Sequence, residues 1–177
     1  MTARALILPP LRRTAADAQR FATIVHEGQV DKAGRPYGKH LSRVARRLLN
    51  LSWHCPFWKD QDTDEAEQIA WLHDTIEDAA TVTVGTLARE GFSETVVAAV
   101  NMLTKPDRPL PYDSWISRLA DIGNLHEILV KLADVEDNSD PERLALLPEE
   151  TRARLLKKYE PAKEVLRAAA RRKGWQG

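Results

Sequence analysis

Helical periodicity runs through almost the whole sequence, and this feature limits the fold more than any other. Apolar residues recur every three or four positions, as they do along one face of an α-helix. Strand-like alternation is confined to residues 82–84, which is too short for a sheet. The sequence is therefore predicted to fold as an all-α protein.

Local start and stop signals divide this pattern into about seven to nine helices. Asp62 or Thr63 is a candidate N-cap, and Ser93 is another. Pro161 is expected to kink or restart the last helix, and three prolines between 106 and 111 predict a stiff, irregular loop. The predicted helices span residues 15–25, 41–51, 62–75, 83–90, 94–104, 112–122, 125–138 and 148–172.

Length and composition narrow the functional classes. With 177 residues the chain is predicted to form one domain, residues 1–177, with a core from about 14 to 168. Lys and Arg balance Asp and Glu at 26 each, so the basic excess that is typical of nucleic-acid binding is missing. No apolar run has the length of a membrane span, residues 1–10 do not resemble a signal peptide, and Cys55 is the only cysteine. A cytoplasmic protein is expected.

Potential metal ligands fall in order on separate predicted helices. His73 and Asp74 are adjacent and end an apolar stripe, His40 lies upstream after a Gly-Pro loop, and Asp134 follows a strongly apolar run. A carboxylate in such a buried position must be paired or coordinated. Mixed imidazole and carboxylate ligation suits Mn²⁺, Fe²⁺ or Zn²⁺ better than Ca²⁺. These four residues are predicted to hold one divalent cation.

Two further carboxylates follow one helical turn later. Glu77 lies four residues after His73, and Asp78 lies four residues after Asp74, so each shares a helical face with a candidate ligand. Either carboxylate could orient or deprotonate a water beside a metal, or pass a proton to a leaving oxygen. This pattern is typical of a hydrolase.

The other candidate residues have simpler explanations. A single histidine on an apolar helix is more commonly a core or capping residue than a ligand, and His54 and His126 are expected outside the site. His26 is expected to be a hydrogen-bonded structural residue near it. Asp137 is interpreted as a solvated carboxylate at a helix end.

Four ordered motifs give the chain a resemblance to the HD-domain metal-dependent phosphohydrolases, and specifically to the hydrolase domain of the RelA/SpoT homologues. The resemblance covers roughly residues 18–166. Its motifs are Phe21-Ala22 with His26-Glu27-Gly28-Gln29, Gly34-Arg35-Pro36-Tyr37, His40 and Val44-Ala45; Leu72-His73-Asp74-Thr75-Ile76-Glu77-Asp78; Leu103-Thr104-Lys105; and Val130-Lys131-Leu132-Ala133-Asp134 with Asn138.

The resemblance implies an HD-type helical bundle and a stand-alone small alarmone hydrolase. The four candidate ligands would hold Mn²⁺, with Fe²⁺ and Zn²⁺ as alternatives, and Glu77 and Asp78 would be catalytic. Asn138 would hold the substrate ribose, and Tyr159 would contact the substrate. Lys32, Lys105 and Lys131 lie within or beside the motifs and are candidates for binding phosphates. The implied reaction removes the 3′-pyrophosphate from (p)ppGpp, the guanosine nucleotide of the stringent response.

Two stretches differ from the family pattern. Basic residues usually follow the glutamine of the first motif, but here Val30 and Asp31 precede Lys32. After Asp134, the stretch that ends in Glu136-Asp137 is more acidic than the family pattern. Both changes lie near the expected nucleotide site, so adenosine forms, (p)ppApp, are included among the expected substrates.

Two other functions remain open at this level. One is an HD-domain nucleotidase that acts on 5′-phosphates. The other is a protein that retains the metal and binds a nucleotide without turnover. The Glu77-Asp78 pair favours an enzyme over the inactive alternative. The sequence leaves the oligomeric state and the physiological metal undetermined.

Overall fold

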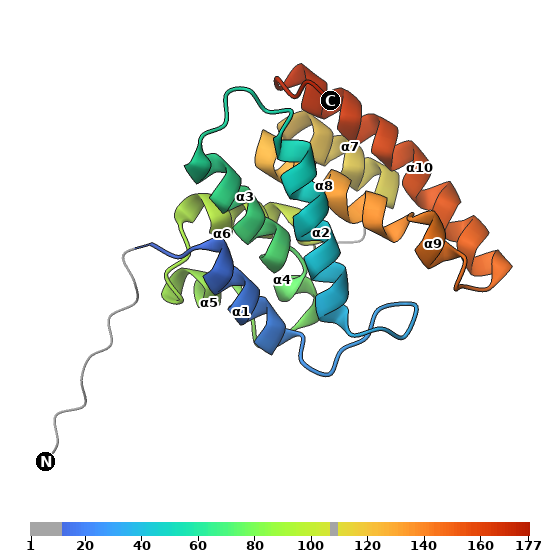
Figure 1. Ribbon diagram of the computed structural model, residues 1–177, viewed down its shortest axis with the longest axis horizontal. Helices are drawn as coiled ribbons and strands as arrows, with labels where there is room; N and C mark the ends of the chain where they lie inside the picture. The colour runs from blue at the N-terminus through green and yellow to red at the C-terminus, as the bar shows by residue number, and fades with distance from the viewer. Residues whose placement is uncertain (1–11, 107–109) are drawn as a thin grey trace, which may run out of the picture.

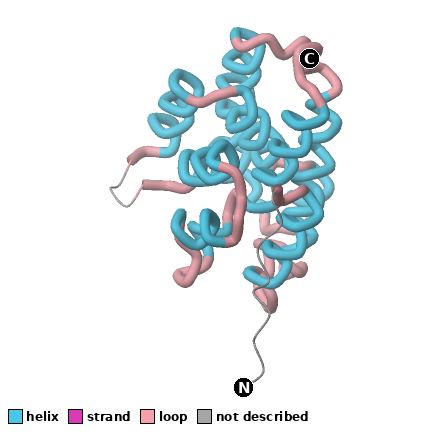
Figure 2. The backbone as a smooth tube through the Cα atoms, turned by 90° about the vertical axis from the view of Figure 1, so that its left-hand side faces the viewer, coloured by secondary structure: helices cyan, strands magenta, loops and turns pink. Residues whose placement is uncertain are grey.

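The structure, a computed structural model, describes residues 12–106 and 110–177. The described residues form eight helices of at least six residues and two of four residues, and they contain no strand (Figures 1 and 2). The prediction of an all-α fold is confirmed. The helices are α1 Ala15–Val25, α2 Tyr37–Ser52, α3 Asp60–Leu72, α4 Thr75–Asp78, α5 Val84–Arg89, α6 Glu94–Leu103, α7 Tyr112–Ile122, α8 Leu125–Asn138, α9 Pro141–Leu144 and α10 Glu149–Arg172.

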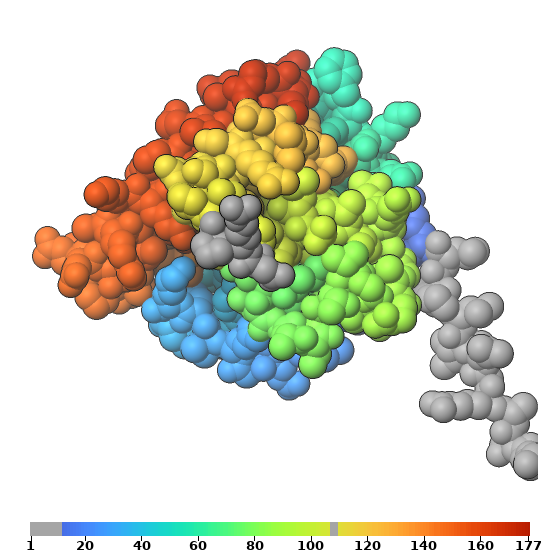
Figure 3. Space-filling view, turned by 180° about the vertical axis from the view of Figure 1, so that it is seen from behind, coloured from blue at the N-terminus to red at the C-terminus, as the bar shows by residue number. Residues whose placement is uncertain are grey.

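Helix α8 lies at the centre of the bundle. It packs against α2, α3, α6, α7 and α10, and its apolar residues are buried on all sides, as expected for a helix without a polar face. Ile128, Leu129 and Leu132 are fully buried there. Seen from behind, α7 (yellow) lies against α10 (orange to red) (Figure 3). Most residues of α8 therefore face the interior, Asp134 and Asp137 among them.

The start of α2 and the end of α3 differ from the predicted boundaries. Helix α2 begins at Tyr37, four residues before the predicted start, directly after Pro36. Helix α3 begins at Asp60, and Asp62 accepts a hydrogen bond from the backbone of Lys59 instead of capping the helix itself. The same helix ends at Leu72, earlier than predicted. Both differences matter because they bring His40 and His73 to helix ends.

The expected restart of the last helix is wrong: α10 continues through Pro161. A proline inside a helix removes one backbone hydrogen bond. Pro161 is exposed, so water can solvate the carbonyl that loses its partner. The flanking residues Tyr159, Ala162 and Leu166 are buried, and this packing compensates for the lost bond.

Two predictions about the chain ends and loops fall partly outside the described residues. These are the absence of a signal peptide in residues 1–10 and the place of Pro109 in the proline loop. The assignment of residues 1–177 to one domain stays a prediction. Among the described helices, none combines the length and the hydrophobicity needed to cross a bilayer.

Candidate active site

The loop before α2 places His40 at the first turn of that helix. A backbone bridge pairs Val30 with Pro36, and the loop between them turns at Gly34, whose φ of 73° lies in the left-handed region that glycine favours. Pro36 then leads directly into α2. His40, one turn later, is only 3% exposed and points into the bundle.

The end of α3 explains how His73 and Asp74 reach the same point. On a continuous helix, adjacent side chains would point about 100° apart. The helix instead ends at Leu72, and Asp74 starts the short helix α4. His73 Nε2 consequently lies 3.0 Å from Asp74 Oδ2.

The four predicted ligands converge on one point. His40 Nε2 lies 3.6 Å from Asp74 Oδ2 and 3.5 Å from Asp134 Oδ1, and His73 Nε2 lies 3.8 Å from the same Asp134 oxygen. Ligand atoms of His40, His73 and Asp74 all lie within 4.8 Å of one another. Neighbouring ligands on one ion with bonds of about 2.0–2.2 Å are separated by about 3–4 Å, so these spacings match a possible metal site.

The hydrogen bonds of the two histidines favour metal binding. His40 Nδ1 bonds Asp137 at 2.7 Å, and His73 Nδ1 bonds the Ala70 carbonyl at 2.8 Å. Each ring therefore directs its Nε2 toward the two carboxylates, and His73 Nε2 is buried without a hydrogen-bond partner among the described residues. A second nitrogen fixed in this way is the usual arrangement of a histidine that binds a metal.

The electrostatics of this cluster also suit a cation. Burial lowers the pKa of His73, but the negative charges of the nearby Asp74 and Asp134 outweigh it and raise the pKa to about 10. Burial raises the pKa of Asp74, yet His73 and His40 hold it well below its usual range. The half-buried Asp74 and the buried Asp134 thus attract positive charge to the point that they share, which a divalent cation can supply.

Glu77 and Asp78 lie on α4, directly beyond the cluster. Glu77 forms an ion pair with Lys105, across from α4 on the loop that follows α6. Burial and the charge of Asp74 raise the pKa of Asp78 above its ordinary value. Both carboxylates line the same cavity as His40 and Asp74.

A cavity of about 250 Å³ opens above the cluster. Ten of the eleven predicted site residues line it, and the eleventh, His73, lies beneath the cavity floor at 2% exposure. The ten are His40, Asp74, Asp134, Glu77, Asp78, Lys32, Lys105, Lys131, Asn138 and Tyr159. The predicted residues therefore form one site, although their separate roles stay predictions.

Besides Lys105, two of the predicted substrate contacts have a partner within the protein, and in both cases it is Asp134. Lys131 Nζ lies 2.7 Å from Asp134 Oδ2 and 4.7 Å from the centre of the Trp115 ring, and the residue is only 9% exposed. Asn138 donates from Nδ2 to Asp134 Oδ1. In this structure both side chains hold Asp134 in place.

The sequence did not predict several residues of the cavity wall. Tyr37 donates a hydrogen bond of 2.6 Å to Asp74, and its place in the first motif was a usable signal. Tyr112 and Lys158 face the cavity beside Tyr159, with the Lys158 ammonium 4.2 Å from the centre of the Tyr112 ring. Nothing in the local sequence marks Tyr112, Lys158 or Arg143, because other helices bring them to the site.

The interpretation of Asp137 as a solvated carboxylate is wrong, because this residue is fully buried. Burial raises its pKa, but hydrogen bonds from His40 and Arg43 outweigh this effect and lower the pKa to about 2. His26 bonds Gln29 at 2.8 Å and stacks on Tyr37. His54 is exposed, and His126 stacks on Trp58, outside the cavity.

Comparison with known proteins supports the fold. A solved structure of a metazoan orthologue of SpoT, which hydrolyses ppGpp and plays a role in starvation responses, matches with a TM-score of 0.62 and 19% identity. The match covers 90% of this chain and 95% of that protein. The chain has the HD-domain fold. No family model and no curated protein sequence matches it, so the HD-domain fold rests on three-dimensional similarity.

Proposed function

We propose that the protein is a Mn²⁺-dependent hydrolase of the 3′-pyrophosphate of (p)ppGpp-type nucleotides, including adenosine forms. The observation that carries the proposal is the convergence of two histidines and two aspartates beneath a cavity that also holds two carboxylates and several lysines. The ppGpp hydrolysis known for the structurally similar SpoT orthologue supports the nucleotide class.

His40, His73, Asp74 and Asp134 would hold the metal. Two imidazoles and two carboxylates favour Mn²⁺, with Fe²⁺ and Zn²⁺ as alternatives. When bound, the ion would supply a Lewis acid that polarises a phosphoryl oxygen and lowers the pKa of water. Tyr37 would keep Asp74 oriented through its hydrogen bond.

Glu77 and Asp78 would move the protons of the reaction. Water attacks the phosphorus next to the ribose, the bond from that phosphorus to the 3′ oxygen breaks, and pyrophosphate leaves as the 3′ oxygen takes up a proton. Glu77 accepts the proton of the attacking water. The raised pKa of Asp78 suits this carboxyl to donate a proton to the leaving oxygen.

The cavity rim would hold the rest of the nucleotide. Among the described residues, neither Lys32 nor Lys158 forms an ion pair, so both ammonium groups can bind phosphate. The Tyr112 hydroxyl is buried without a hydrogen-bond partner in the described part of the chain, and its ring packs edge-to-face on Tyr159. These rings offer an apolar wall for the nucleoside.

Replacing Lys158 with methionine should raise KM about tenfold and change kcat little, since a phosphate contact remote from the reacting bond contributes roughly 1–2 kcal/mol to binding. Lys157→Met is the matched control, because Lys157 is exposed and does not line this cavity. Steady-state kinetics of both variants test the assignment. Equal KM values for Lys158→Met and the unaltered protein would remove Lys158 from the substrate site.

Manganese should stabilise the fold. A ligand present at a hundred times its Kd adds about 2.7 kcal/mol, which for a chain of this size raises Tm by about 5–10 °C. Thermal unfolding with Mn²⁺ and with chelator measures the shift. Ca²⁺ at the same concentration should give a smaller one, because it prefers oxygen ligands. Equal shifts for both ions would argue against the histidine-containing site.

The function itself is tested by incubating the protein with Mn²⁺ and guanosine and adenosine 3′-pyrophosphates, with ordinary nucleotides alongside. Release of pyrophosphate from the 3′ side is the expected result. Orthophosphate or triphosphate release from 5′-phosphates would instead identify a nucleotidase, and tight binding without turnover would identify an inactive binding protein. A hundredfold preference for the guanosine substrate corresponds to about 2.7 kcal/mol. It would exclude relaxed base selection but would leave the proposed hydrolase activity standing.

A further inference from the structure

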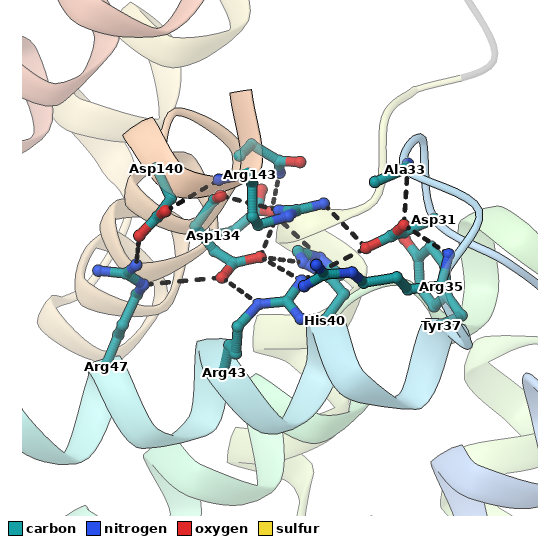
Figure 4. Close-up of polar contacts among 12 residues, drawn as sticks. Asp31, Ala33, Arg35, Tyr37, His40, Arg43, Arg47, Asp134, Asp140 and Arg143 are labelled. Atoms are coloured by element: carbon teal, nitrogen blue, oxygen red, sulfur yellow. Dashed lines mark hydrogen bonds and ion pairs between the residues drawn. The ribbon is translucent and has the colours of Figure 1, made fainter. Parts of the chain in front are cut away.

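Asp31 and Asp137, which both depart from the family pattern, share the same two arginines. Arg43 donates to Asp137 at 2.7 and 3.2 Å and to Asp31 at 3.4 Å. Arg143 donates to Asp137 at 2.5 Å and to Asp31 at 3.1 Å. Figure 4 shows Arg43 projecting from α2 toward Arg143 and Asp31. The four side chains form a largely buried network of alternating charge.

Asp137 also contacts one of the proposed metal ligands, His40, through a single hydrogen bond. Its Oδ2 lies 2.7 Å from His40 Nδ1, while His40 Nε2 faces Asp74 and Asp134. A carboxylate can only accept in this bond, so the proton must sit on Nδ1. The lone pair of His40 is thereby assigned to Nε2, the atom that points to the proposed ion.

We infer that Asp137 is a positioning residue that fixes the ring and the tautomer of His40 for metal binding, and that Arg43 and Arg143 hold Asp137 in place. Arg143 makes two hydrogen bonds to Asp137: it donates to the side-chain carboxylate and, at 2.8 Å, to the backbone carbonyl of the same residue. Partners of this kind commonly tune a metal site through its histidine ligand. The inference rests on the metal of the proposed function and is independent of its substrate.

The same network reaches the phosphate side of the cavity. Asp31 accepts backbone hydrogen bonds from Ala33 at 2.9 Å and Arg35 at 3.1 Å, and so closes the loop that carries Lys32. Because Arg43 and Arg143 bind both aspartates, the network links this loop to the helix that carries His40. One set of buried ion pairs thus sets the positions of a metal ligand and of a rim lysine.

The test compares Asp137→Asn with Asp140→Asn. Asp140 pairs with Arg47 at 2.5 Å and caps α9, a role that asparagine retains, and Asp140 makes no contact with His40. Calorimetric titration of the metal-stripped proteins should show Mn²⁺ affinity lowered 10- to 100-fold by Asp137→Asn and changed less than twofold by Asp140→Asn. In the diamagnetic Zn²⁺ form, the ¹⁵N resonances of His40 should show loss of the single Nδ1–H tautomer only in Asp137→Asn.

Arg43→Gln provides a second variant if Asp137→Asn does not fold. It removes one partner of Asp137 without touching His40, and should lower Mn²⁺ affinity several-fold. A lower Tm with unchanged Mn²⁺ affinity in these variants would show that the network is only structural and would overturn the inference. Failure of the unaltered protein to bind any divalent cation would overturn it as well. Normal Mn²⁺ binding without nucleotide hydrolysis would refute only the proposed function.

Discussion

Replacing His73 with alanine is expected to cause a large loss of hydrolysis, even in excess Mn²⁺. The variant removes a ligand whose Nε2 lies 3.0 Å from Asp74 and 3.8 Å from Asp134. A catalytic metal contributes several kcal/mol to the transition state, so its loss should lower kcat/KM by about 10²-fold or more. Calorimetric titration measures the loss of Mn²⁺ affinity, and steady-state kinetics measure the loss of turnover.

His54→Ala is the matched control for this variant. His54 is exposed and does not line the cavity. Its replacement should leave both Mn²⁺ affinity and turnover unchanged. If His73→Ala bound Mn²⁺ as tightly as the unaltered protein, the metal site would have to lie elsewhere.

Replacing Glu77 with glutamine is expected to lower kcat by about 10² or more, the usual contribution of a general acid–base group. The amide keeps the shape of the side chain but cannot accept a proton. Mn²⁺ affinity should be retained, because Glu77 is not among the four converging residues His40, His73, Asp74 and Asp134. Kinetics at saturating metal, together with metal titration, separate the two properties.

The ion pair between Glu77 and Lys105 requires its own control. Glu77→Gln also frees Lys105, so part of the loss could come from a displaced lysine. Lys105→Met breaks the same ion pair and leaves the carboxylate. Because Lys105 is also a candidate phosphate contact, the comparison is made in kcat at saturating substrate. A fall in kcat in Lys105→Met as large as that in Glu77→Gln, or near-normal kcat in Glu77→Gln, would mean that another group handles the water.

The sequence by itself determined the class of fold and most members of the site. Periodicity of three to four residues is a local property, and it correctly predicted an all-α protein and the bounds of α1, α7 and α8. Side chains whose chemistry is rare in an apolar setting, such as His73 and Asp134, were recognisable because burial of such groups requires a partner.

Only the tertiary structure decided how these groups meet. His73 and Asp74 lie at the break between α3 and α4, where their side chains meet. Asp137 looked like a surface carboxylate because its partners, Arg43 and Arg143, come from other helices. Tyr112 and Lys158 reach the cavity for the same reason. Burial of a helix face gives a regular spacing of apolar residues that can be recognised in the sequence. Hydrogen bonds and ion pairs between distant segments produce no such spacing.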